Sequence, residues 1–99
     1  MFIISLHYIV PLEELDAHMP EHVKFLNTYY KQNIFLTSGR KVPRTGGIII
    51  AHGKSKEALE AIMAEDPFCK HGLADVTITE FLNSQTHPAF KKMMKESFR

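Results

Sequence analysis

The stretch IFLTSGRKVPRTGGIIIAH, residues 34–52, decides the fold of this chain. Its first part, Ile34–Val42, and its last part, Gly47–His52, are rich in the aliphatic and β-branched residues typical of strands. Between them lies Pro43–Gly46, a cluster of turn-forming residues, so the stretch predicts an antiparallel β-hairpin. The Gly46-Gly47 pair lacks the flanking residues of a phosphate-binding loop and is predicted to belong to the turn.

One strand and one main helix precede the hairpin. Phe2–Val10 alternates polar residues with β-branched and aromatic ones, which predicts a strand. Pro11–Ala17 favours a short helical lead-in, with acidic residues suited to a helix N-terminus. Because a proline inside a helix removes a hydrogen bond, we expect the main helix to begin near Pro20 and end near Gln32. Its apolar face is predicted to consist of Val23, Leu26 and Tyr30, with Phe25 and Tyr29 alongside.

One helix and one strand follow the hairpin. Ser55 is a typical N-cap, and apolar residues at helical spacing behind it predict a helix over Lys56–Glu65. Asp66-Pro67 ends that helix, since the residue before a proline is pushed out of the helical conformation. Two elements complete the predicted order: a strand over Ala74–Leu82, with Val76 and Ile78 on one face, and a short helix over Pro88–Lys95.

The order strand, helix, strand, strand, helix, strand is that of an α+β ferredoxin-like sandwich, βαββαβ, with a C-terminal helix added. Residues 1–99 suit a single domain with a thin core. Two helices can cover only one face of a four-stranded sheet, which leaves apolar residues of the other face in water. The pattern therefore predicts a homodimer that buries the second face.

Composition excludes several classes of partner. The hydrophobic fraction of 44% and the charged fraction of 23% are typical of a packed globular domain. Twelve Lys and Arg stand against eleven Asp and Glu, so no strong field favours nucleic acid or a membrane surface. There is no run long enough to span a bilayer and only one cysteine, and we expect a cytoplasmic protein.

His22 is the first candidate for chemistry. It falls on one helical stripe with Phe25, Leu26 and Tyr29, so its imidazole should face the sheet or a pocket. The alternative is a half-buried structural histidine bonded to a backbone carbonyl. Asp66 could orient the ring and stabilise the imidazolium, although aspartate before proline is also an ordinary helix N-cap.

The hairpin offers candidate ligand contacts. Ser38 can donate a hydrogen bond, and Gly39 would allow a left-handed turn or a close approach of the backbone to a ligand, with a strand bulge as the alternative. Arg40, Lys41 and Arg44 could neutralise a carboxylate or phenolate, although basic residues at a hairpin tip are usually solvated.

No metal or other cofactor is predicted. His18 and His22 stand four residues apart, but Pro20 lies between them and the glutamate of the usual zinc motif is missing. Cys69 has no evident activating partner and is treated as a small apolar residue.

Four segments together resemble the YCII-related family in order and spacing. They are PEHVKFL at 20–26, TSG at 37–39, PRTGG at 43–47 and EDPF at 65–68. The resemblance implies a ferredoxin-like fold of the dimeric α-β barrel superfamily, a pocket in each subunit, and an active histidine–aspartate pair at His22 and Asp66. Many relatives carry proline at position 40, where this chain has Arg40, so the resemblance does not define the loop shape there, and Arg40 adds a candidate anion contact.

The resemblance also implies a kind of chemistry, because relatives include a dehydrochlorinase of a chlorinated hydroxyquinol and the superfamily includes muconolactone isomerases. We therefore expect a lyase or isomerase acting on a small oxygenated cyclic compound. His22 would move the proton, Asp66 would orient it, and four residues would contact the substrate: Ser38, Gly39, Arg40 and Phe68. The alternative is a non-catalytic dimeric ligand-binding or accessory module.

Overall fold

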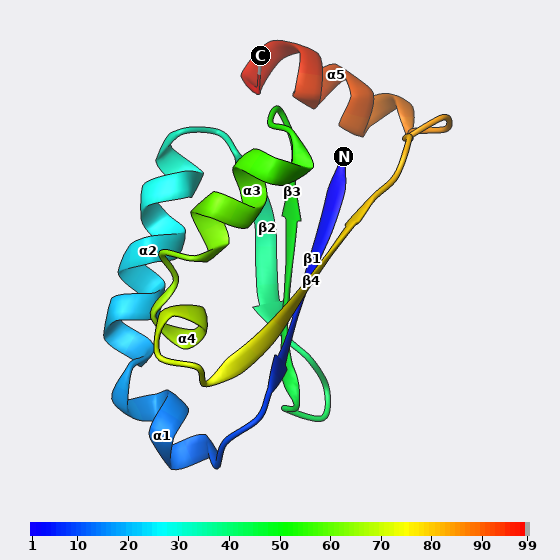
Figure 1. Ribbon diagram of the computed structural model, residues 1–99. Coiled ribbons are helices and arrows are strands. Elements are labelled where there is room, and N and C mark those ends of the chain that lie inside the picture. Colours follow the sequence, from blue (N-terminus) through cyan, green and yellow to red (C-terminus); the bar gives the residue numbers. More distant parts are fainter. Residues whose placement is uncertain (99) are drawn as a thin grey trace.

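The computed structural model describes residues 1–98 of the 99-residue chain (Figure 1). The predicted order of elements is confirmed, and the predicted ends lie within two residues of the observed ones, but the short helix α4 was not predicted. The elements are β1 Phe2–Tyr8, α1 Leu12–Ala17, α2 Met19–Lys31, β2 Phe35–Arg40, β3 Gly46–Ala51, α3 Lys56–Met63, α4 Pro67–Lys70, β4 Ala74–Glu80 and α5 Pro88–Ser97.

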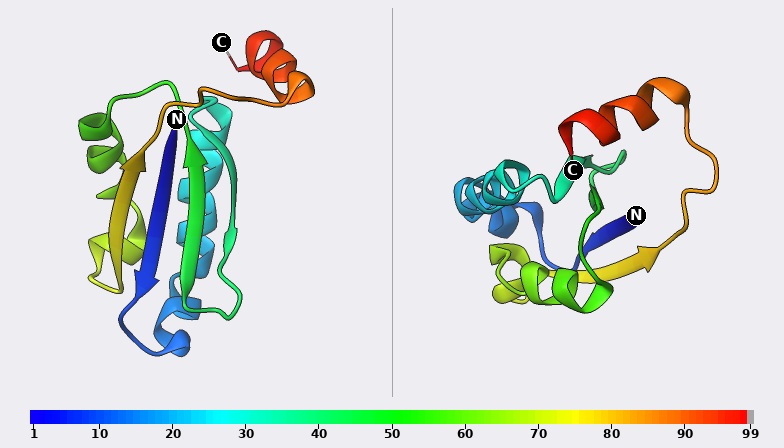
Figure 2. Two further views of the ribbon diagram at one scale, coloured as in Figure 1. Left: turned by 90° about the vertical axis from the view of Figure 1, so that its right-hand side faces the viewer. Right: turned by 90° about the horizontal axis from the view of Figure 1, so that it is seen from above.

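The four strands form one antiparallel sheet in the order β2–β3–β1–β4. At the middle of β1, Ile4 stands opposite Ile49 of β3 and Ile78 of β4. Figure 2 shows the helices α2, α3 and α4 on one face of this sheet, while α5 lies beyond its end. Within the described part of the chain, the opposite face carries no helix. The fold is thus the α+β, ferredoxin-like arrangement that the sequence predicts.

The core lies between the sheet and its helices. Phe2, Ile4 and Leu6 alternate along β1 and are at most 3% exposed. Phe25 and Tyr29 of α2 pack over them, whereas Val23, predicted on the apolar face, is 44% exposed. The buried stripe of α2 is therefore the one that contains Phe25 and Tyr29. Full burial of a side chain of this size stabilises the fold by about 1.5–3 kcal/mol.

Two helix ends have local explanations. Pro20 occupies the first turn of α2, where its missing N–H group is not needed, and the prediction that this helix begins near Pro20 is confirmed. Asp66 does follow the end of α3, but its side chain also accepts a hydrogen bond from the Phe68 N–H and so begins α4. Val76 and Ile78 stand opposite Leu6 and Ile4 of β1, so they share one face as predicted, and Val76 on the edge strand β4 is 39% exposed.

The glycines of the hairpin do not have the positions and backbone conformations that were predicted. Gly46 and Gly47 begin β3 instead of forming the turn. A Cβ atom on Gly46 would overlap the Leu6 carbonyl oxygen, so the close pairing of β1 and β3 requires glycine there. Gly39 lies inside β2 without a left-handed conformation, and the irregularity of that strand falls between Phe35 and Thr37.

The C-terminal helix α5 stands apart from the sandwich (Figures 1 and 2). The Phe98 ring, directly after α5, meets the His52 ring at 6.1 Å between centroids, in an edge-to-face arrangement. Among residues 1–98, none of the helices has the length and apolar character needed to cross a membrane.

Candidate functional site

The site is built around His22, which projects from the second turn of α2. The helix begins directly after His18, whose carbonyl accepts the His22 N–H at 3.0 Å. This places His22 on the same stripe as Phe25 and Tyr29, as the sequence predicts, and turns its side chain toward α4 and the sheet.

His22 and Asp66, 44 residues apart in sequence, meet through a hydrogen bond of 2.7 Å between Nδ1 and Oδ1. A carboxylate only accepts, so Nδ1 of His22 carries the proton and Nε2 is left as the basic nitrogen. The same Oδ1 accepts the Phe68 N–H at 3.3 Å. Asp66 is therefore both the predicted N-cap and the partner of the histidine.

The side chains of His22 and Asp66 differ in their exposure to solvent. The Asp66 side chain is fully buried, whereas 13% of the His22 side chain remains exposed. The Phe68 ring stacks on the imidazole with centroids 4.1 Å apart and planes 8° apart. Phe68 was predicted to contact substrate, but it is 1% exposed and does not line the cavity. It supports the imidazole from behind instead.

His22 lines a cavity of about 280 Å³ between α2 and the strands β1, β2 and β3. Three of the predicted ligand contacts, Ser38, Gly39 and Arg40, line the same cavity. The remaining walls come from α2, the three strands and the turn between β2 and β3: Leu6, Tyr8, Met19, Val23, Leu26, Arg44, Gly47, Ile48 and Ile49. The cavity therefore combines apolar walls with a cluster of cationic and hydroxyl groups.

Two guanidinium groups give the cavity its charge. Arg44 donates to the Asp16 carboxylate at 2.6 Å, which lowers the pKa of Asp16 and raises that of Arg44. Within residues 1–98, the Arg40 side chain makes no hydrogen bond or salt bridge, although its charge also lowers the pKa of Asp16. Arg40 is thus the cation left to meet an anionic group in the cavity.

Ser38 is held in place by a neighbour that the sequence did not connect with it. Its hydroxyl shares a hydrogen bond of 2.5 Å with the Tyr30 hydroxyl. Tyr8 was also missed as a cavity residue. The period-2 alternation of β1 puts Tyr8 on the same side as Leu6 and Ile4, so this signal was available.

Two further candidates from the sequence, His18 and Cys69, do not line the cavity. His18 does not converge with His22 and instead stacks on His71, with ring centroids 4.6 Å apart. Cys69 lies beside Asp66, with its sulfur 4.0 Å from Oδ2. Burial, followed by the charges of Asp66 and Asp75, raises the pKa of the Cys69 thiol to about 12. A thiol that stays protonated at neutral pH is a poor nucleophile.

These observations define an α+β, ferredoxin-like domain with a small cavity on the helical side of its sheet. Residues 1–82 match the YCII-related domain, and the chain belongs to this family. No curated protein matches the chain. One similar solved structure is 5-chloro-2-hydroxyhydroquinone dehydrochlorinase (TftG) from Burkholderia phenoliruptrix AC1100, in complex with 2,5-dihydroxybenzoquinone. It is 17% identical over 83% of this chain and 94% of that chain, with a TM-score of 0.68, which establishes the shared fold.

Proposed function

We propose that this protein is a small-molecule enzyme of lyase or isomerase type. In this proposal His22 transfers a proton, and Asp66 orients the His22 ring. The observation that carries the proposal is the 2.7 Å hydrogen bond between His22 Nδ1 and Asp66 Oδ1, at the wall of a cavity. A base held by a buried carboxylate is the arrangement that general acid–base catalysis needs.

The proposed step begins with Nε2 of His22, which takes a proton from a carbon next to a carbonyl group. Asp66 stabilises the imidazolium that forms. The electron pair of the broken C–H bond becomes a double bond. In a lyase, a leaving group departs from the neighbouring carbon with its own electron pair. In an isomerase, His22 returns the proton to a different carbon. Neither course consumes an oxidant or reductant.

The cavity walls suggest the class of substrate. Arg40 and Ser38 would bind an oxygen that carries negative charge, and the apolar walls, such as Leu26 and Ile49, would hold a ring. A volume of about 280 Å³ suits a single ring with small substituents. That a structural relative is named as a dehydrochlorinase of a chlorinated hydroxyhydroquinone is consistent with a small oxygenated cyclic substrate.

Hydrogen–deuterium exchange at carbon tests this proposal without knowledge of the leaving group. The protein is incubated in D₂O with 2,5-dihydroxybenzoquinone, hydroxyquinols and unsaturated lactones, and loss of C–H signals is followed by NMR. We expect the parent to catalyse exchange for at least one compound and His22→Ala to lose roughly 10²–10⁴-fold of that rate. Lys24→Ala, an exposed change on the same helix, is the matched control. Equal exchange by parent and His22→Ala would refute the assignment.

The alternative, a non-catalytic dimeric ligand-binding or accessory module, has one observation in its favour. Asp66 is sealed from solvent and His22 is only 13% exposed, as in a pair that merely satisfies itself. Thermal shift with the same compounds separates the two. Ligands that raise the Tm of the parent without any exchange at carbon would favour the binding module.

A further inference from the structure

Three side chains that commonly bind metals converge between the start of α2 and the end of α4, outside the cavity described above. One ligand atom each from His18, Glu21 and His71 lies within 4.8 Å of the other two. We propose that these residues form a binding site for a divalent transition-metal ion, with Zn²⁺ as the ion they fit best. The proposal goes beyond the proton transfer assigned to His22, which needs no metal.

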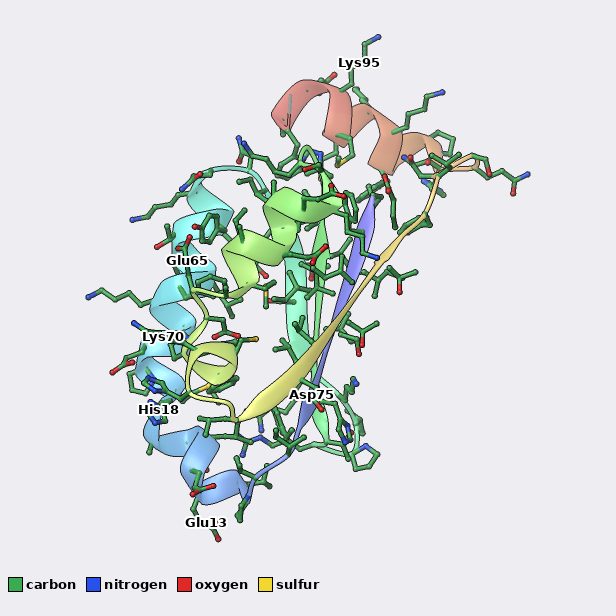
Figure 3. The ribbon with its side chains drawn as sticks, in the orientation of Figure 1. Glu13, His18, Glu65, Lys70, Asp75 and Lys95 are labelled. Atoms are coloured by element: carbon green, nitrogen blue, oxygen red, sulfur yellow. The ribbon has the colours of Figure 1, made fainter. Side chains whose placement is uncertain are left out.

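The backbone already holds the three residues in place. The His18 N–H donates to the Leu15 carbonyl at 2.9 Å, and His18 is the residue from which α2 begins. Glu21 follows three positions later, which puts both side chains on the same side of the first turn. His71 ends α4, with its N–H bonded to the Pro67 carbonyl at 3.0 Å. Figure 3 shows His18 at the junction of α1 and α2, on the side where α4 approaches.

The side chains are close to coordination geometry. The rings of His18 and His71 stack with centroids 4.6 Å apart and planes 29° apart, which brings their nitrogens alongside each other. Zn–ligand bonds of about 2.0–2.2 Å in a tetrahedron separate the ligand atoms by roughly 3.4 Å. Glu21 and His71 are exposed, so side-chain rotation suffices to close the remaining gap.

The donor set favours one group of metals. Two imidazoles and one carboxylate suit Zn²⁺ and leave its fourth position for water. Mg²⁺ and Ca²⁺ prefer sites made of oxygen alone. The Glu21 carboxylate makes no hydrogen bond or salt bridge with the rest of residues 1–98, so metal binding would not break an existing contact of this group.

A metal here would join the two segments that carry the histidine–aspartate pair. Glu21 directly precedes His22, and His71 lies five residues after Asp66 on the segment that includes α4. The ion would therefore act as a cross-link between the start of α2 and the end of α4. Because an ion that binds only the folded state stabilises it, Zn²⁺ should raise the Tm of the protein.

The test is a Zn²⁺ titration of the chelator-stripped protein against a chromogenic competitor. We expect one equivalent of Zn²⁺ to bind. The substitutions His18→Ala, Glu21→Gln and His71→Ala should each raise the Kd for Zn²⁺ by at least about tenfold. His87→Asn is the matched control, because it removes a histidine at the start of α5, at the opposite end of the molecule, and keeps an N-capping side chain (Figure 1). Zn²⁺, but not Mg²⁺, should raise the Tm of the parent and of this control.

Several results would overturn the site. They are the absence of Zn²⁺ binding, equal Kd values for the parent and the three variants, and binding that depends on His22 but not on His18 or His71. Circular dichroism of each variant shows whether a loss of binding comes from loss of fold. Co²⁺ provides a second readout, because its visible absorption bands should appear in the parent and disappear in His71→Ala.

Discussion

At the residue scale, Asp66 connects the stability of the chain to its proposed chemistry. Its Oδ1 accepts hydrogen bonds from the His22 ring and from the Phe68 N–H, and its Oδ2 lies near the Cys69 sulfur. Among the described residues, no buried side-chain nitrogen or oxygen lacks a hydrogen-bond partner. A single side chain therefore starts α4, fixes the histidine and fills the space between them.

Asp66→Asn should reduce both the stability of the protein and its proposed catalytic activity. The amide can occupy the same volume, but it cannot stabilise an imidazolium as a carboxylate does. We expect a loss of stability of about 1–3 kcal/mol in urea denaturation and a fall in exchange at carbon of at least about 10²-fold. Asp75→Asn, an exposed change on β4, is the matched control. A variant as stable and as active as the parent would remove Asp66 from both roles.

The raised pKa of Tyr29 predicts how the stability of the protein changes at alkaline pH. Its hydroxyl donates to Glu65 at 2.7 Å. Burial, and then this carboxylate, raise the pKa of Tyr29 from 10.0 to about 12. Since the folded state disfavours the phenolate, this contribution to stability is complete below about pH 10, the pKa of an unfolded tyrosine, and is lost as the pH rises through about 12.

Urea denaturation of the parent and of Tyr29→Phe between pH 8 and pH 12 measures this effect. Both proteins should lose stability in alkali as other groups titrate. The parent should lose more, because only the parent gives up the Tyr29 contribution. Parallel stability curves for the two proteins would show that folding does not raise the pKa of Tyr29.

At the element scale, periodic patterns predicted most of the fold. Within residues 1–98, strand alternation, helical spacing and, for α1, proline with acidic residues located eight of the nine elements. The ninth, α4, spans four residues, too few to show a period. The contact between His22 and Asp66 joins residues 44 apart in sequence. Spacing gave each of them a local role only, and the family resemblance supplied the pairing. The cluster of His18, Glu21 and His71 had no sequence signal, because α4 itself was not predicted.

Gly46 shows a constraint that arises between elements. An added Cβ would overlap the Leu6 carbonyl on β1, so Gly46→Ala must separate β1 from β3 or displace the backbone. We expect a loss of about 1–3 kcal/mol or more in urea denaturation. Gly39→Ala is the contrast, since a Cβ there meets nothing within 4 Å and its φ is not left-handed. It should be neutral or stabilising by about 0.4–1 kcal/mol, and equal losses at both positions would contradict the close-approach argument.

At the scale of the whole molecule, the face of the sheet away from the helices is the main surface that no described element covers. Ile3 stands there opposite Ile50 and Thr79, and Ser5 stands opposite Ile48. Ile3 is 37% exposed, and Ile48 and Ile50 are half-buried. Figure 2 shows that α5 lies beyond the end of the sheet and leaves this face open. Apolar residues at the centre of an open sheet favour burial against another surface.

A second copy of the chain is the partner that we propose for this face, because an isologous contact pairs the same apolar centre with itself. Light scattering of the parent should then give twice the 11.3 kDa chain mass. Ile3→Lys should shift the mass toward the monomer, since it places two like charges near the centre of the contact. Val42→Lys, at a hairpin position that is 95% exposed, should leave the dimer intact. A parent that stays monomeric across dilution would mean that the open face is tolerated in water, and that each cavity is complete within one chain.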